Sequence, residues 1–106
     1  MSLSTHVLDA VRGRPAAGVP VRLTTAAGDP LAQARTDDDG RVRELAAELE
    51  AGDYRITFDT GEYFAATGQK GFYPEVAVTF TVTDPGQHHH VPLLLSPFAY
   101  STYRGS

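Results

Sequence analysis

Strict alternation of apolar and polar residues, interrupted at short intervals by turn residues, most limits the folds open to this chain. Val76, Val78, Phe80 and Val82 occupy one parity, and alanine and threonines occupy the other. Successive strand side chains point to opposite faces, so this segment predicts a strand with one core face. Ten Gly and seven Pro, spread along the chain, leave room only for short elements. The pattern favours an all-β domain over a helical bundle.

The same alternation recurs in Val19–Leu23 and Tyr54–Phe58, where Thr57 is expected to face outward. Asp39-Gly40 is a hairpin signal, because Gly tolerates the positive φ of tight turns. About eight strands in all predict a two-sheet β-sandwich. The other expected strands are Thr5–Ala10, Leu31–Thr36, Arg41–Leu45, His88–Leu95 and Ala99–Arg104.

One short helix is expected at Thr60–Thr67. Asp59 can cap its start, Glu62 stands three residues later as in a capping box, and Gly68 can end it in the left-handed conformation. The segment Arg43–Glu50 is rich in Ala, Leu and Glu, and its composition is compatible with either a short helix or a strand.

Charge and cysteine content exclude several classes of protein. The 106 residues suit one domain, residues 1–106, and carry 13 acidic against 9 basic side chains, a net charge of -4. Nucleic-acid binders are usually basic, so that class is not expected. Without Cys there is no disulfide framework and no thiolate site. Because the chain also shows no membrane-length apolar run and no secretory leader, we expect a cytoplasmic protein that binds no membrane.

Three consecutive histidines are the most unusual feature. On a strand, His88 and His90 share one face, whereas His89 joins the apolar residues of the other face. The pair is compatible with a surface strand carrying spare imidazoles. A metal site completed by His6 is a second interpretation, since three imidazoles can hold zinc, but no obvious carboxylate stands ready to orient the imidazoles.

From their positions alone, His6 and Arg41 need no functional role: His6 suits an edge strand, and Arg41 suits a solvated turn. The chain end is less ordinary, because termini normally fray while this one ends in an aromatic residue and an arginine, Tyr103-Arg104, before Gly-Ser. The composition therefore suggests a docked terminus.

These residues together resemble the 5-hydroxyisourate hydrolase family, whose fold is shared with the carrier transthyretin. The terminal Tyr103–Ser106 separates enzymes from carriers, and His89 is a departure because the family usually has Tyr there. The matching segments cover nearly the whole chain: Leu3–Asp9, Pro15–Val21, Asp39–Arg41, Gly61–Phe64, Phe72–Val76, His88–Pro97 and Tyr100–Ser106.

The resemblance implies a transthyretin-like sandwich, assembled as a homotetramer (a dimer of dimers) with active sites where the dimers meet. It implies hydrolysis of 5-hydroxyisourate in urate degradation, with no metal or organic cofactor. His6, Arg41 and His90 carry over as catalytic residues, and His6, Arg41, Tyr103 and Ser106 as substrate-binding residues. A neutral imidazole can move the protons of ring hydrolysis, and a guanidinium can stabilise the charge that develops on the attacked carbonyl oxygen.

Three alternatives remain at this stage. A non-catalytic transthyretin-like carrier would use the same sandwich, because fold alone does not determine function. A metal hydrolase would use His6, His88 and His90 as ligands. An adhesion module would need neither site, but the absence of Cys and of a leader counts against it.

Overall fold

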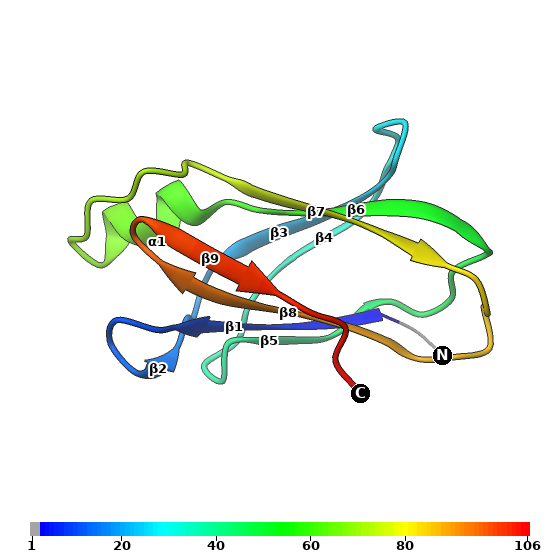
Figure 1. The fold of residues 1–106 in the computed structure, drawn as a ribbon, viewed down its shortest axis with the longest axis horizontal. Helices are drawn as coiled ribbons and strands as arrows, with labels where there is room; N and C mark the ends of the chain where they lie inside the picture. The colour runs from blue at the N-terminus through cyan, green and yellow to red at the C-terminus, as the bar shows by residue number, and fades with distance from the viewer. Residues whose placement is uncertain (1–2) are drawn as a thin grey trace.

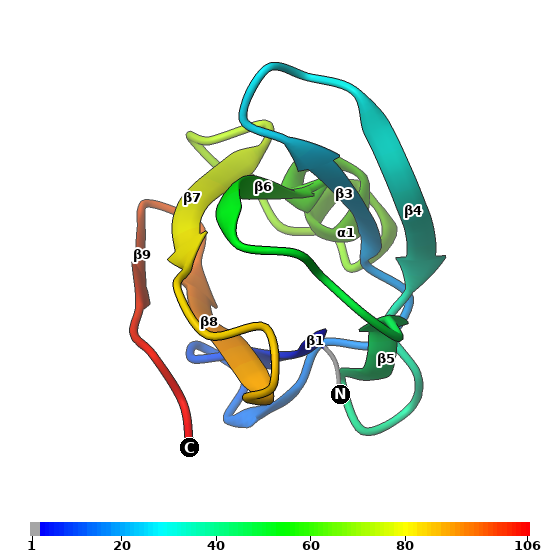
Figure 2. The same ribbon diagram turned by 90° about the vertical axis from the view of Figure 1, so that its right-hand side faces the viewer.

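The computed structural model describes residues 3–106 and forms two packed sheets, as Figures 1 and 2 show. The first sheet has the order β2-β1-β8-β9, with β5 also paired to β1, and the second has the order β4-β3-β6-β7. The strands of the first sheet are β1 Leu3–Asp9, β2 Arg14–Pro15, β5 Arg41–Ala46, β8 His89–Ser96 and β9 Ala99–Thr102. The strands of the second sheet are β3 Pro20–Thr25, β4 Pro30–Arg35, β6 Gly52–Phe58 and β7 Val76–Val82. The described residues thus confirm the all-β two-sheet prediction, with nine strands in place of about eight.

The core lies between the sheets and is built from the alternating apolar positions. Val7 and Leu93 from the first sheet, and Leu23, Ile56 and Phe58 from the second, are all fully buried. Burying such side chains is worth about 1.5–3 kcal/mol each. Alternation therefore predicted the inner faces of these strands correctly.

Thr57 departs from the prediction, because it is buried although its parity places it on the outer face. β6 is a central strand, so Thr57 lies between Arg22 of β3 and Ala77 of β7 in the register of the sheet.

The prediction of a hairpin at Asp39-Gly40 is wrong, although a tight turn does form there. β4 belongs to the second sheet and β5 to the first, so the turn carries the chain between the layers. The Asp37 carboxylate accepts hydrogen bonds from the amides of Asp39 and Arg41, which closes the turn without a strand ladder. Gly40 has φ +75°, and a Cβ there would overlap the Val7 carbonyl oxygen. The turn therefore fixes where β5, and Arg41 with it, begins.

The segment Arg43–Glu50, whose composition suited either a helix or a strand, continues β5 as far as Ala46 and then becomes irregular.

The helix prediction is confirmed: α1 spans Thr60–Ala66, and the Asp59 carboxylate accepts a hydrogen bond from the Glu62 amide at 3.1 Å. Gly68 follows with φ +70°. Across the described part of the chain, no helix has the length and apolar character needed to cross a membrane.

A buried carboxylate joins α1 to the end of β1. Asp9, 1% exposed, accepts hydrogen bonds from the Tyr63 hydroxyl at 2.7 Å, the Gln69 amide at 3.1 Å and two backbone amides of the following turn. Burial opposes ionisation, but the hydrogen bonds from Tyr63, Arg12, Gln69 and Val11 outweigh it, and the pKa of Asp9 lies below its ordinary value. Burial and the adjacent carboxylate raise the pKa of Tyr63 to about 12.

Asp9→Asn is expected to lower the free energy of unfolding by about 1–3 kcal/mol at pH 7, because it weakens a buried hydrogen-bonded acceptor. The depressed pKa makes the Asp9 contribution complete above about pH 4, and it is lost as the pH falls below that value. Urea unfolding at pH 7 and pH 3 measures the difference between wild type and variant, which should shrink at pH 3. Asp38→Asn, in the exposed turn, is the control. An equal difference in unfolding free energy at both pH values would contradict the stabilising role of the ionised Asp9 carboxylate.

Candidate functional site

The outer face of the first sheet gathers the polar residues that the sequence singled out. β1 and β8 run parallel, which places Ser4 opposite His90 and His6 opposite Pro92. β5 pairs with the other edge of β1 and places Arg41 opposite His6. Directly opposed residues lie on the same face of a sheet, so imidazoles from both ends of the chain share one surface with this guanidinium.

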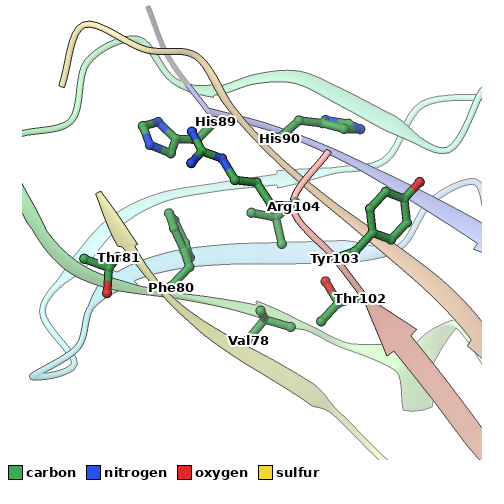
Figure 3. Close-up of a pocket in the computed structure, with 9 residues that line it drawn as sticks. Val78, Phe80, Thr81, His89, His90, Thr102, Tyr103 and Arg104 are labelled. Atoms are coloured by element: carbon green, nitrogen blue, oxygen red, sulfur yellow. The ribbon is translucent and has the colours of Figure 1, made fainter. Parts of the chain in front are cut away.

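The predicted alternation of the three histidines is confirmed. His89 is 6% exposed and lies on the inner face with Val91 and Leu93, whereas His88 is exposed and His90 is half-buried. Figure 3 shows His89 and His90 on opposite sides of β8, with Tyr103 on the side of His90 and Arg104 on the side of His89.

An open pocket of about 250 Å³ lies on this outer face. His90, Arg41 and Ser106 line it together with Arg43 and residues of β1. A neighbouring pocket of about 330 Å³ is lined by His90 and Tyr103, among others, and appears in Figure 3. His90 therefore borders both pockets, and His6 lies beside them on β1.

Burial and the charges around His90 favour the neutral form of its ring. Burial lowers the pKa of His90 first, and the nearby Arg41, His6 and His88 lower it further. A guanidinium close to an imidazole disfavours the imidazolium form. The ring is therefore able to accept a proton near neutral pH.

The chain end docks on β8, as its composition suggested. The Gly105 amide donates to the His90 carbonyl at 2.8 Å and forms an isolated antiparallel bridge. In Figure 2 the segment after β9 runs on beside β8 toward the chain end. This contact delivers Ser106 to the pocket, whereas Tyr103 stays 60% exposed. A side chain at position 105 would overlap the His90 ring, so only Gly permits this approach.

Ser4 is the site residue that sequence reasoning missed. Its hydroxyl lies 2.7 Å from His90 Nδ1 and 2.8 Å from His88 Nε2. Residues two apart on a strand share a face, so Ser4 lies on the face of His6, but the parallel pairing of β1 with β8 is what brings it between two imidazoles.

The metal alternative gains no support from this geometry. Within residues 3–106, no three His, Cys, Asp or Glu side chains are grouped so that they could hold a metal ion. One nitrogen of His88 and one of His90 face the Ser4 hydroxyl instead.

The comparisons with known proteins agree with this architecture. The HIUase/Transthyretin family matches residues 3–105, and the chain belongs to that family. A 5-hydroxyisourate hydrolase of Caulobacter vibrioides is 48% identical, over 98% of this chain and 97% of its own length. The solved structure of Klebsiella pneumoniae 5-hydroxyisourate hydrolase superposes with a TM-score of 0.92 at 40% identity, covering 100% of both chains. Sea bream transthyretin in complex with thyroxine superposes with a TM-score of 0.91 at 36% identity, over 99% of this chain and 95% of that one.

Gly105→Ala is expected to detach the chain end from β8, because the added methyl overlaps the His90 ring. Loss of the bond between the residue 105 amide and the His90 carbonyl should speed amide exchange at residue 105 roughly tenfold, the value of a typical hydrogen bond. Hydrogen exchange followed by NMR measures this. Gly86→Ala, in an exposed turn with more room, is the matched control. Unchanged protection at residue 105 would show that the tail tolerates a side chain there.

Proposed function

We propose that this chain is a hydrolase that opens the six-membered ring of 5-hydroxyisourate, a step of urate degradation. The observation that carries the proposal is the pocket that His90 shares with Arg41 and the docked Ser106, where burial and the nearby Arg41 lower the pKa of His90. The hydrolase names of relatives that align over nearly the full chain support it. We also propose that residues 1–106 form one domain, in line with the family match over 3–105.

The reaction needs an activated water and stabilisation of charge on the attacked carbonyl oxygen. His6 and His90 form the acid–base pair: one takes a proton from water, and the leaving ring nitrogen receives a proton as the ring opens. Arg41 lies opposite His6 and binds the oxygens of the ring through its planar fork. It also stabilises the negative charge that develops on the attacked oxygen.

Tyr103 and Ser106 complete the substrate site in this proposal. Tyr103 closes one side through its ring and donates a hydrogen bond through its hydroxyl. Ser106 lines the pocket because Gly105 holds the tail against β8. No step requires a metal ion or an organic cofactor.

We further propose a homotetramer, a dimer of dimers, with each site formed where dimers meet. Leu8 and Leu94 are only half-buried on the outer face beside the site, and Tyr103 is 60% exposed in the single chain. A second dimer over this face would bury these apolar groups and close the pocket.

A cytoplasmic location fits a chain without cysteine, because disulfides belong to oxidising compartments.

A non-catalytic carrier is the second candidate, favoured by the close superposition on sea bream transthyretin bound to thyroxine. A carrier needs no neutral imidazole beside an arginine, so the site favours the hydrolase. Decay of the ultraviolet absorbance of freshly made 5-hydroxyisourate separates the two candidates.

His90→Ala should lower the turnover of 5-hydroxyisourate by roughly 10²–10⁴-fold, the usual contribution of a general acid or base. Light scattering should show the same tetramer as for wild type, because the change removes a side chain that lines the pocket and leaves the apolar contacts of Leu8 and Leu94 in place. His89→Tyr is the control and should keep its activity, since residue 89 faces the core. Near-normal turnover of His90→Ala would discard the acid–base role.

Arg41→Gln should reduce kcat/KM by roughly 10²–10³-fold, the typical cost of removing a group that stabilises an oxyanion. It should also move the acid limb of the pH profile to higher pH, because the Arg41 charge helps to lower the pKa of His90. Arg41→Lys keeps the charge and should leave the limb near its wild-type place, below about pH 6.5. If both variants share the wild-type limb, Arg41 does not tune His90.

A further inference from the structure

The Ser4 hydroxyl lies between two imidazoles and has no part in the mechanism above. Its oxygen is 2.7 Å from His90 Nδ1 and 2.8 Å from His88 Nε2, and the residue is only 9% exposed. The β1–β8 register holds Ser4 directly opposite His90, so the contact follows from the sheet itself.

The Ser4 hydroxyl carries a single proton, so it can donate a hydrogen bond to only one of the two imidazole nitrogens. Ser4 donates to one imidazole nitrogen and accepts an N–H from the other. Each arrangement therefore dictates the tautomer of both rings. Because Ser4 occupies Nδ1 of His90, only Nε2 remains for water or substrate. His90 can act as a base through Nε2 only when Nδ1 carries the proton and donates it to Ser4.

We propose that Ser4 is a positioning residue that holds His90 with Nδ1 protonated and Nε2 free as the general base, while His88 Nε2 accepts the Ser4 proton. The proposal rests on the hydrolase function proposed above and deepens it by assigning the base. When Nε2 takes a proton from water, His90 becomes an imidazolium whose Nδ1–H still points at Ser4. That hydrogen bond becomes charge-assisted and strengthens at this step. As the proton moves to Nε2, the water oxygen bonds to the attacked carbonyl carbon, and the carbonyl electron pair moves to the oxygen that Arg41 stabilises.

The other groups facing His90 make this support necessary. His6 from β1, Arg41 from β5 and the preceding His88 all disfavour the imidazolium, and Arg43 and Ser106 line the same pocket. Such surroundings favour the neutral ring, whereas a backbone hydrogen bond of Ser4 raises the pKa of His90 and so favours the charged ring. Ser4 supplies the acceptor for it.

The tautomer can be read directly by NMR of protein labelled with ¹⁵N-histidine, without substrate. At pH 7.5 the wild type should show His90 with a protonated Nδ1 and an unprotonated Nε2. His90→Gln assigns the signals. Ser4→Ala should give a mixture of both tautomers. A wild-type His90 protonated at Nε2 alone would overturn the proposal.

Kinetics give the second test. Ser4→Ala should lower kcat roughly 10- to 100-fold with little change in KM, because a hydrogen bond to a charged group is worth about that factor. Its acid limb should move to lower pH, since the imidazolium loses an acceptor. Ser4→Thr keeps the hydroxyl and should restore both. Ser96→Ala, which removes a hydroxyl bonded to the Ala99 carbonyl in the β8–β9 turn, is the matched control and should behave as wild type.

A double-mutant cycle tests whether His88 belongs to the same chain of hydrogen bonds. If it does, Ser4→Ala with His88→Ala should cost about as much as Ser4→Ala alone, because coupled residues are not additive. Additive losses, or a Ser4→Ala enzyme with wild-type kcat and acid limb, would overturn the proposal. An inactive wild type would instead refute the hydrolase function, while the NMR result still reports on the tautomer.

Discussion

The parallel pairing of β1 with β8 is the constraint on which the candidate site depends. It joins residues more than eighty positions apart and runs over the whole of β1, from Leu3 opposite His89 to Asp9 opposite Leu95. The inner faces of the two strands are buried against the second sheet, so the register cannot slip without exposing core residues. The outer face of the same strands has the same register, so its imidazoles keep fixed positions although they are not in the core.

Two further contacts complete the site, and both depend on glycine. Gly40 allows the turn before β5 to approach the Val7 backbone, which sets Arg41 opposite His6. Gly105 allows the chain end to lie against His90. In both places a Cβ would strike a neighbouring atom. The catalytic proposal therefore rests on close backbone approach as much as on the polar side chains.

Much of the fold was predictable from local pattern. Alternation identified the inner faces of β3, β6 and β7, and the Asp59 cap located α1, because both signals depend on neighbours in the chain. Two predictions failed where distant partners decide. The Asp39-Gly40 turn changes sheets instead of closing a hairpin, and Thr57 is buried although it lies on the outer face of a central strand. Neither outcome has a local signal.

The sequence by itself determined which strand faces are apolar and which carry His6 and His90, since a period of two follows from the geometry of a single strand. It also carried the family resemblance that the comparisons bear out. Only the tertiary structure decided that Ser4 lies between two imidazoles and that Arg41 lies close enough to lower the pKa of His90. These are relations between strands, and a one-dimensional pattern holds no distance between segments that meet only when the sheet forms.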